Sequence, residues 1–579
     1  MQEDDRRHGD IMTATDAHVL LRAFCDELAR CGMTDACSSP GSRCAPLVLA
    51  LAREPRMRCW SHLDERCAGF FALGLGKASG RPAAVACTSG TAAANLAPAV
   101  HEAREARVPL LVLTADRPPE LREVGAGQTI DQLRLYGTAA KWFFEVGVHE
   151  ATPDRLRWMR SLACRAFWTA LERPAGVVHL NFPLREPLVP DGPLEADGTG
   201  RPDGAPWIQR LHAPDDRAQT AEMGRRVLGG GRRGVVVAGR LEAGARIGGA
   251  LARVAADAGL PLLADPLSGA RRGAAAVAHY DALLRVGGFR DGRRPDVVVR
   301  VGDLPTSKPL REWLAGLEGV AQATIGIDPY PSDPAAAVGT SMVGEPVGLV
   351  ESLAALEPSD PDWLAMWREP DARAADAIRA GLGGELSEPR VAAELGSRLP
   401  AEATLVAASS MPVRDVETFF PVRDDPPRVL ANRGANGIDG TVSTAFGVAA
   451  ATAGPVVLLI GDVALAHDLG GLLCASRLGL KLTVVVLNND GGGIFHFLPV
   501  AGERDVFEEH VATPHGLDFS QAAALYGCDH QLVDDPEGFA GALGRALEAA
   551  ATTILEVRTD REANLALHRR LWDDLARAL

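Results

Sequence analysis

The strongest chemical signal in this 579-residue chain is a pair of polar motifs, each of which follows a run of apolar residues. Gly461 and Asp462 come directly after the run 456–460, and the motif Asn488–Gly493 follows the run 483–487. Such runs are typical of buried parallel strands, whose carboxyl ends share one edge of a sheet where ligands bind. We therefore expect the two motifs to lie side by side at that edge.

Oxygen atoms are the ligands that these motifs offer. Asp462 has a carboxylate, Asn489 a neutral carbonyl oxygen, and Gly491 a backbone carbonyl. Oxygen ligands of low total charge suit Mg²⁺ (or Mn²⁺), with diphosphate oxygens completing the coordination, and the glycines let the backbone approach phosphates closely. The alternative is that Asn-Asn-Asp-Gly is an ordinary turn. The spacing matches the signature with which thiamine diphosphate enzymes hold their cofactor.

Far upstream, Glu65 follows a predicted strand and opens a helix rich in small residues. Thiamine chemistry needs a carboxylate beside N1′ of the aminopyrimidine, because a hydrogen bond there promotes the imino form that removes a proton from the thiazolium ring. The alternative is that Glu65 only favours the positive end of a helix. The metal motif favours the catalytic interpretation.

Four loops at predicted strand ends carry arginine. They are Ser39–Arg43, Thr114–Glu120, Ser410–Arg414 and Asn432–Gly440. Arginine binds carboxylates with two parallel hydrogen bonds, so these loops predict substrates with several carboxylates. The alternative is a set of surface ion pairs, which contribute little to stability and are common in an arginine-rich chain.

The apolar runs predict which elements position these residues. In the first part of the chain, strands are expected at 35–38, 57–60, 83–87 and 110–114, with helices at 18–31, 65–77 and 92–106. In the second part, strands are expected at 234–239, 261–264, 297–301 and 323–327, and in the third at 404–407, 429–431, 456–460 and 483–487. This alternation predicts parallel sheets covered on both faces by helices.

Segments rich in Pro, Gly and Asp separate these parts. One covers residues 189–216, and a polar stretch with prolines lies at 357–371. We therefore expect an α/β chain of three doubly wound parallel-sheet domains. Their expected bounds are 1–190 with Glu65, 205–356, and 385–579 with the metal motif.

Composition excludes several classes of function. The net charge of −15 and the pI of about 5.5 argue against nucleic-acid and anionic-membrane partners. No apolar stretch is long enough to span a bilayer, and the polar start of the chain has no signal-peptide pattern, so a cytoplasmic enzyme is expected. The ten cysteines form no Cys-x-x-Cys pair, which favours buried free thiols over a zinc site.

Taken together, the motifs resemble those of one branch of the thiamine diphosphate enzymes. These are the 2-succinyl-5-enolpyruvyl-6-hydroxy-3-cyclohexene-1-carboxylate synthases of menaquinone biosynthesis. The likeness covers nearly the whole chain and is weakest in the middle. It is carried by the strings at 39–43, 62–66, 88–91, 113–120, 432–440 and 488–495. Those at 114–120 and 432–440 are specific to this branch.

The resemblance implies a transferase that uses thiamine diphosphate and Mg²⁺ or Mn²⁺. Such an enzyme decarboxylates 2-oxoglutarate and adds the remaining succinyl unit to isochorismate. The thiazolium ring is the electron sink for the decarboxylation, and no redox cofactor is needed.

The resemblance also implies roles for individual residues. Glu65 matches the activating glutamate, and Asp462, Asn489 and the carbonyl of Gly491 match the metal ligands. Ile438 matches the apolar residue that holds the bent cofactor. The other cofactor-binding positions are Thr88, Gly90, Gly461 and Gly492. The substrate-pocket positions are Ser42, Arg43, Arg117, Gln128, Lys308, Ser410, Arg414, Arg433, Ile494 and Phe495.

Within that pocket, Ser410 and Arg414 are expected to hold the succinyl carboxylate. Arg43, Arg117, Gln128 and Lys308 are expected to face isochorismate. The chain departs from the family at one place, because some members have Lys-Arg where Lys308 is followed by Pro309. A proline cannot bind a carboxylate, and Arg311 lies nearby in the sequence.

The resemblance further implies a homodimer, or a homotetramer, with the active site at the subunit interface. Glu65 and Asp462 would then serve one cofactor from two chains.

Three other interpretations stay open at this point. The first is another thiamine enzyme, either a 2-oxoacid decarboxylase or an acetolactate-synthase-like enzyme with FAD. The second is a nucleotide-binding oxidoreductase, suggested by the strand at 234–239, although no G-x-G-x-x-G follows it. The third is a non-catalytic scaffold.

Overall fold

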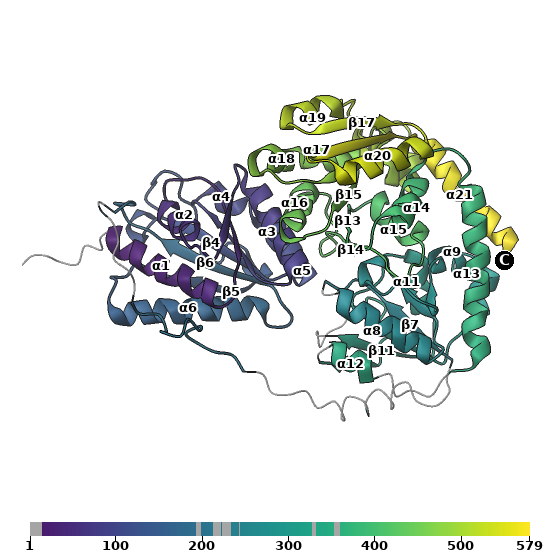
Figure 1. The fold of residues 1–579 in the computed structure, drawn as a ribbon, viewed down its shortest axis with the longest axis horizontal. Helices are drawn as coiled ribbons and strands as arrows, with labels where there is room; N and C mark the ends of the chain where they lie inside the picture. The colour runs from purple at the N-terminus through teal and green to yellow at the C-terminus, as the bar shows by residue number, and fades with distance from the viewer. Residues whose placement is uncertain are drawn as a thin grey trace, which may run out of the picture. The chain divides into compact units, whose positions relative to one another are not determined.

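The computed structural model describes residues 14–190, 192, 198–211, 222, 233–242, 244–326, 332–344, 346–352 and 359–579. The chain forms two compact units, residues 1–212 and 213–579. The first holds one six-stranded sheet and the second holds two (Figure 1). All strand pairs in the three sheets are parallel, so the predicted α/β class is confirmed.

The sheet of the first unit has the order β2-β1-β3-β4-β6-β5. Its strands are β1 (Asp35–Ser38), β2 (Arg58–Ser61), β3 (Ala83–Cys87), β4 (Leu110–Asp116), β5 (Ala140–Glu145) and β6 (Val177–Pro183). Helices α1 (Ala14–Arg30), α2 (Ala45–Ala52) and α6 (Pro153–Leu171) pack their apolar residues against one face. Helices α3 (Glu65–Ser79), α4 (Thr91–Ala94) and α5 (Ala97–Ala106) follow β2 and β3.

The second unit begins with the sheet β12-β11-β10-β7-β8-β9. Its strands are β7 (Gly234–Ala238), β8 (Leu262–Ala264), β9 (Ala276–Val277), β10 (Val297–Val301), β11 (Ala321–Gly326) and β12 (Thr340–Val343). Numbered along the chain, this order is 3-2-1-4-5-6, the arrangement of dinucleotide-binding folds. Its helices are α8 (Gly244–Asp257), α9 (Tyr280–Leu283), α10 (Gly287–Asp291), α11 (Lys308–Ala315) and α12 (Pro346–Ser352).

The last sheet has the order β14-β13-β15-β16-β18-β17. Its strands are β13 (Thr404–Ala407), β14 (Arg428–Leu430), β15 (Val456–Gly461), β16 (Thr483–Asn488), β17 (Asp529–Val533) and β18 (Thr553–Arg558). Its helices are α14 (Glu388–Arg398), α15 (Met411–Phe419), α16 (Thr441–Ala451), α17 (Asp462–His467), α18 (Leu473–Leu478), α19 (Phe519–Tyr526), α20 (Pro536–Glu548) and α21 (Arg561–Ala578). When the strands of each sheet are numbered along the chain, this sheet and the sheet of the first unit have the same strand order.

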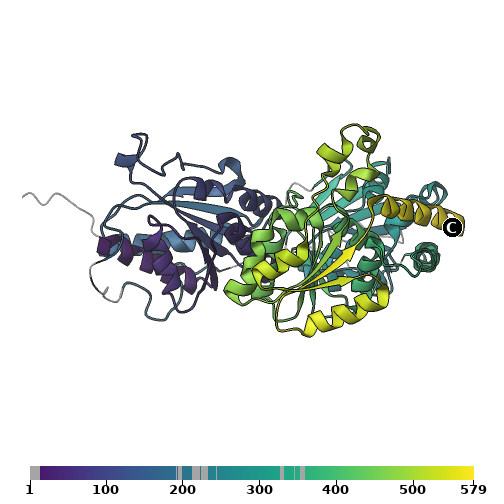
Figure 2. The same ribbon diagram turned by 90° about the horizontal axis from the view of Figure 1, so that it is seen from above.

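A shared apolar core joins the two sheets of the second unit. Side chains of β7 and β10 belong to the same cluster as those of β13, β15 and β16. The long helix α13 (Pro361–Gly381) runs along this unit beside α21, as Figures 1 and 2 show. Its Trp363 and Trp367 are fully buried, and Trp363 Nε1 donates to Gly234 O at 2.8 Å. Large buried aromatic rings of this kind contribute strongly to the stability of a core.

Two expectations about local structure need correction, and the expected linker is described in part. The stretch 357–371 is helical from Pro361 onward, because its tryptophans bury against the core although its prolines suggest a connection. The helix expected at 92–106 is divided into α4 and α5, with Pro98 in the first turn of the second. Residues 198–211 of the expected linker form no helix or strand but are bound to the first unit, where Trp207 N donates to Glu27 and Arg30 Nη1 donates to Arg201 O. Part of that linker, including 212–216, lies outside the described residues.

The ten cysteines are free thiols, and nine of them are buried. Glu27, Cys31 and Cys164 lie close together, but both oxygens of Glu27 already accept hydrogen bonds, one from Trp207 N and one from Arg160. Among the described helices, none combines the length and the apolar character needed to cross a membrane.

Candidate active site

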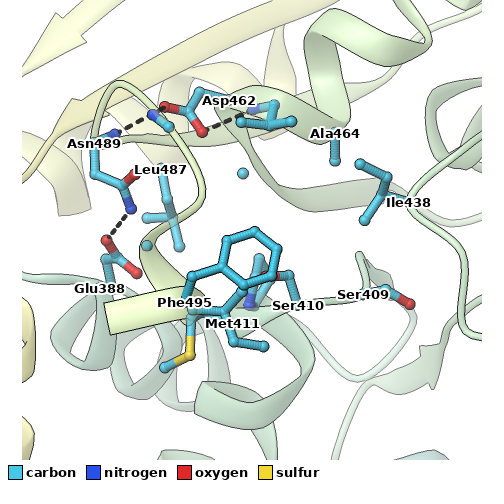
Figure 3. Close-up of a pocket in the computed structure, with 16 residues that line it drawn as sticks. Glu388, Ser409, Ser410, Met411, Ile438, Asp462, Ala464, Leu487, Asn489 and Phe495 are labelled. Carbon is cyan, nitrogen blue, oxygen red and sulfur yellow. Dashed lines mark hydrogen bonds between the residues drawn. The ribbon is translucent and has the colours of Figure 1, made fainter. Parts of the chain in front are cut away.

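A pocket opens at the carboxyl edge of the last sheet. In this sheet the chain passes from β13 to β14 on one side and then to β15 on the other, and such a reversal leaves a crevice between the first and third strands. The pocket lies at that crevice (Figure 3). It is lined by Glu388, Ser409, Ser410, Met411, Pro412, Ile438, Gly461, Asp462, Val463, Ala464, Leu487, Asn489, Gly491, Gly493, Ile494 and Phe495.

Eight of the predicted site residues are therefore brought together in one pocket. They are Ser410, Ile438, Gly461, Asp462, Asn489, Gly491, Ile494 and Phe495. The predicted Gly492 lies between two lining residues. Its backbone N–H donates to Ala512 O at 2.7 Å, so its own amide is held by the protein.

Asp462 is almost fully buried at the start of α17. Its Oδ2 accepts hydrogen bonds from the backbone N–H groups of Gly491 at 2.9 Å and Asn489 at 3.2 Å, so it joins the ends of β15 and β16. Its Oδ1 accepts from Val463 N at 2.7 Å. Burial raises the pKa of this carboxyl group, and the backbone donors oppose that effect by stabilising the charged form.

Asn489 presents a buried carbonyl oxygen. Its Nδ2 donates to Glu388 Oε1 at 2.8 Å, whereas its Oδ1 has no hydrogen-bond partner among the described residues. A buried polar atom without a partner is costly, and native proteins rarely keep one without a ligand, an ion or a water for it. The donor set of one carboxylate, one amide oxygen and backbone carbonyls fits a small divalent cation.

The loop after β16 needs glycine. Gly491 has a φ of +143°, and a Cβ there would lie 2.5 Å from Ala512 O. A side chain would therefore displace the backbone that carries the predicted ligand carbonyl. Asp490 secures the same loop, because its Oδ1 accepts from the backbone N–H groups of His515 at 3.0 Å and Gly516 at 2.8 Å.

Two side chains beside the metal motif were not predicted from the sequence. Glu388 is 1% exposed, and burial, followed by the charge of Asp415, raises its pKa to about 7. His515 places Nε2 at 3.3 Å from Asp462 Oδ2, while its Nδ1 accepts from Leu517 N at 3.0 Å. Glu388 is the first residue of α14, directly after Ser387, and no local pattern in the sequence distinguishes it.

Three arginines of the second unit, Arg414, Arg433 and Arg311, lie close enough for their charges to interact. Arg414 and Arg433, both predicted substrate residues, have lowered pKa values; partial burial is the main cause, and the pKa of Arg433 falls to about 10. The charge of Arg311 contributes to both shifts, so the three guanidinium groups share one electrostatic environment. Arg414 Nη1 also donates to Ser410 O at 2.5 Å. Ser410 itself has a φ of +75°, a strained conformation for serine.

Lys308 is not among the lining residues. It stands at the exposed start of α11, with 78% of its side chain accessible, and its Nζ lies 3.5 Å from Glu312 Oε1. Pro309 is buried in the first turn of the same helix. The electrostatic influence of α11 on Arg414 and Arg433 comes from Arg311.

In the first unit, Glu65 is the first residue of α3. The neighbouring Asp64 caps this helix by accepting from Arg66 N at 2.8 Å, and Glu65 is the acidic residue of the first turn. Glu65 is partly exposed. Its charge adds to the effect of burial in raising the pKa of Cys44 to about 11, which places Glu65 near the loop that follows β1.

Strand ends of the first sheet approach each other at its own reversal point. Here the chain passes from β1 to β2 and then to β3 on the other side. Gly41, after β1, is so close to Thr88, after β3, that a Cβ on the glycine would lie 2.4 Å from Thr88 Cβ. This edge is therefore the equivalent of the pocket edge in the last sheet.

The predicted residues around this edge form a hydrogen-bonded group. Arg117 Nη1 donates to Ser89 Oγ, and Gln128 Nε2 donates to Ser89 O at 3.0 Å. Gly90 N donates to Gln132 Oε1 at 2.9 Å. Gln132 was not predicted from the sequence, and its buried side chain also donates to Ala115 O, so it ties the loop after β3 to β4.

Arg43 is held by internal partners, whereas Ser42 is exposed. Arg43 Nη1 donates to Leu184 O at 2.8 Å, and its Nη2 lies 2.9 Å from Glu186 Oε1. The charge of Arg43 lowers the pKa of Arg117, after the larger effect of partial burial. The two guanidinium groups therefore lie near each other on the first unit.

Family models match all three parts of the chain. Residues 19–135 match the thiamine pyrophosphate enzyme, N-terminal TPP binding domain. Residues 202–406 match the middle domain of thiamine pyrophosphate enzymes, and residues 411–557 match their C-terminal TPP binding domain.

Curated relatives match over nearly the full length. A 2-succinyl-5-enolpyruvyl-6-hydroxy-3-cyclohexene-1-carboxylate synthase of Geobacillus kaustophilus is 43% identical, covering 97% of this chain and 98% of the relative. Proteins of the same name from Chloroflexus aurantiacus, covering 96% of each chain, and Rubrobacter xylanophilus, covering 95% and 97%, are 43% and 45% identical. The chain therefore belongs to the 2-succinyl-5-enolpyruvyl-6-hydroxy-3-cyclohexene-1-carboxylate synthase family of thiamine pyrophosphate enzymes.

Proposed function

We propose that the chain decarboxylates 2-oxoglutarate and adds the succinyl unit to isochorismate, giving 2-succinyl-5-enolpyruvyl-6-hydroxy-3-cyclohexene-1-carboxylate and CO2 in menaquinone biosynthesis. The observation that carries this function is the pocket in which Asp462, Asn489 and Gly491 converge, in a chain 41–45% identical to synthases of this name. Thiamine diphosphate supplies the electron sink for the decarboxylation when bound.

At the pocket, Asp462 Oδ1, Asn489 Oδ1 and the carbonyl of Gly491 would hold Mg²⁺ or Mn²⁺ and, through it, the diphosphate. The support is the buried Asn489 oxygen without a partner and the burial of Asp462. Gly461 has open space where a side chain would stand and would leave room for the diphosphate, with Gly492 in the neighbouring loop, and Ile438 in the pocket wall would support the bent cofactor.

Glu65 would hydrogen-bond the aminopyrimidine N1′ and hold a proton there, with Thr88 and Gly90 as the backbone around it. All residues that line the pocket lie within 388–495, whereas Glu65 belongs to the first unit. We propose a homodimer, with a homotetramer as the larger alternative, in which Glu65 of one chain and Asp462 of another serve one cofactor.

The substrates are dicarboxylates, which fits the arginine-rich loops. Ser410 and Arg414 would hold the distal carboxylate of 2-oxoglutarate, with Arg433 beside them and Ile494 and Phe495 as the apolar wall. Ser42, Arg43, Arg117, Gln128 and Lys308 would face isochorismate. Because Lys308 is paired with Glu312 and Pro309 cannot bind an anion, Arg311 is the residue of α11 best able to add positive charge.

We further propose domain bounds of 1–190 for the pyrimidine-binding domain, 205–356 for the central domain and 385–579 for the diphosphate-binding domain. The support is the position of Glu65 in the first sheet and of the metal motif in the last. The cytoplasm is the proposed location, since the substrates are soluble metabolites.

The test is an assay with 2-oxoglutarate, isochorismate, thiamine diphosphate and Mg²⁺. We expect isochorismate to disappear only when all four components are present. Equally fast CO2 release without isochorismate would show a simple 2-oxoacid decarboxylase instead. Thermal unfolding provides a second check, because thiamine diphosphate with Mg²⁺ must raise the melting temperature if it binds the native state. The absence of any shift at saturating cofactor would favour a non-catalytic scaffold.

A further inference from the structure

Glu388 is a buried carboxyl group that touches the metal motif without belonging to it. It is the first residue of α14, 1% exposed, and it lines the pocket. Its Oε1 accepts two hydrogen bonds, from Asn489 Nδ2 at 2.8 Å and from Thr559 Oγ1 at 2.9 Å. Thr559 is itself tied to the motif, because its backbone N–H donates to Asn488 O at 2.9 Å.

These contacts decide which way the Asn489 amide faces. Glu388 Oε1 accepts in both of these bonds, so it pairs with the NH2 group of Asn489 and leaves Oδ1 turned the other way. That oxygen is buried and has no hydrogen-bond partner within the described part of the chain. Figure 3 shows Asn489 between Glu388 on one side and Asp462 on the other. A rotated amide would present two N–H donors to a cation, which would repel it.

We propose that Glu388 is a positioning residue for the cofactor's metal ion, which acts by fixing the amide of Asn489 with its oxygen toward the ion. The proposal rests on the metal site of the proposed function. Thr559 takes part in the same arrangement, because its hydroxyl group donates to the accepting oxygen of Glu388 and holds it in place.

The expected size of the effect follows from other metal sites. Removing a group that orients a metal ligand typically weakens metal binding by about 10- to 100-fold. Asp462 has its own orienting donors in the backbone of Gly491 and Asn489. Asn489 has Glu388 as the one partner of its Nδ2 that the described residues supply.

The experiment is a titration of the full-length protein with Mn²⁺ at saturating thiamine diphosphate, in which electron paramagnetic resonance measures free Mn²⁺. For Glu388→Leu we expect the Mn²⁺ dissociation constant to rise by about 10- to 100-fold. Glu388→Gln keeps an accepting oxygen, so its dissociation constant should stay within about 3-fold of the wild type. Thr559→Val should give a smaller loss than Glu388→Leu.

Glu394→Leu is the matched control. Glu394 is on the same helix and also mostly buried, but it pairs with Arg390 and Arg398 and is not a pocket residue. The Glu394→Leu variant should bind Mn²⁺ with the same affinity as the wild-type protein. Thermal unfolding without cofactor should show that each variant is folded, so that a loss of Mn²⁺ affinity is not a loss of structure.

The outcomes separate this proposal from the proposed function. Wild-type Mn²⁺ affinity in folded Glu388→Leu would overturn the positioning role, and so would equal losses in Glu388→Gln and Glu388→Leu. If Asp462→Ala loses Mn²⁺ binding in the same series, the metal site itself stands whatever Glu388 does. If the wild-type protein binds no Mn²⁺ with thiamine diphosphate, the metal site of the proposed function fails and this proposal fails with it.

Discussion

Glu65 lies in the first turn of α3, and its neighbour Asp64 supplies the side-chain cap of this helix. The cap of α3 therefore does not depend on the carboxylate of Glu65, which can be changed without removing the cap. Glu65→Gln keeps the size of the side chain but cannot hold the proton, and we expect turnover to fall by about 10²- to 10⁴-fold. Cofactor affinity, measured by calorimetry, should change little. Wild-type turnover in this variant would contradict the activating role, and Asp64→Asn, which keeps a capping side chain, is the control.

Substitution of Arg414 tests whether this residue binds 2-oxoglutarate, as proposed, and not isochorismate. A charge-assisted hydrogen bond to a carboxylate contributes about 1.5–3 kcal/mol, so Arg414→Ala should reduce kcat/KM for 2-oxoglutarate by about 10- to 100-fold. The KM for isochorismate should change much less. The measurement is steady-state kinetics with each substrate varied in turn. A larger effect on isochorismate would reverse the assignment.

Individual residues differ in how far the sequence could predict them. Asp462 and Asn489 follow apolar runs at an informative spacing, and the pocket brings them together. Glu388 contacts Asn489 and Thr559, which are 101 and 171 positions away. Such contacts exist only after three separate elements have packed, so no local pattern contains them. Gln132 was missed for the same reason, since its partner Gly90 lies 42 positions away.

At the scale of the element, the loop after β16 is sensitive to one added methyl group. Gly491→Ala would force a Cβ to within 2.5 Å of Ala512 O at a φ of +143°. We expect a loss of about 1–3 kcal/mol of stability and weaker binding of thiamine diphosphate with Mg²⁺. Chemical denaturation and calorimetry would measure both. Gly544→Ala, inside α20 with open space around it, should be neutral or slightly stabilising. Equal behaviour of the two variants would contradict the argument.

Strand β6 carries a pH-sensitive residue. His179 is fully buried, its Nε2 is 2.8 Å from Thr114 Oγ1, and burial lowers its pKa to about 3. In the unfolded chain His179 binds a proton near pH 6.5, whereas in the folded chain it stays neutral down to about pH 3. Its contribution to the free energy of unfolding is therefore fully present above pH 6.5 and is lost as the pH falls toward 3. From pH 7 to pH 5 the loss is about 2 kcal/mol. His179→Gln should lack this part of the pH dependence in denaturant unfolding, and an unchanged dependence would contradict it.

The elements show why strand prediction succeeded in some places and failed in others. Strands β3, β10 and β13 have the expected bounds because they are short, mostly apolar runs that are buried along their whole length. Strand β6 was missed because His179 and Asn181 interrupt its apolar pattern, although both are buried. His179 Nε2 lies 2.8 Å from Thr114 Oγ1, and Asn181 Nδ2 donates to Asp116 Oδ2 at 2.9 Å. Both partners belong to β4, so these are contacts across the sheet that the local sequence does not reveal.

On the scale of the whole molecule, the first and last sheets share one strand order, although their sequences resemble each other only in the alternation of strands and helices. Each sheet therefore offers one ligand edge at its reversal point, and the proposed dimer would join one edge from each chain. Mixing Glu65→Gln with Asp462→Ala tests this directly. Each variant alone should be inactive, whereas mixed dimers should contain one intact site and recover up to about a quarter of wild-type activity.

The control for that mixture is each variant mixed with wild-type protein under the same exchange conditions, with the mass of the assembly measured by light scattering. A mixture that stays inactive although mixed dimers have formed would place Glu65 and Asp462 of one chain in the same site.

The most direct test of the central claim follows carbon through the reaction. With 2-oxoglutarate labelled at its C1 carboxylate and with isochorismate, thiamine diphosphate and Mg²⁺ present, we predict labelled CO2 and isochorismate loss in equal amounts. The remaining unlabelled succinyl unit should appear in the ring product by mass spectrometry. Labelled CO2 without isochorismate loss, or isochorismate loss without labelled CO2, would contradict the proposed reaction.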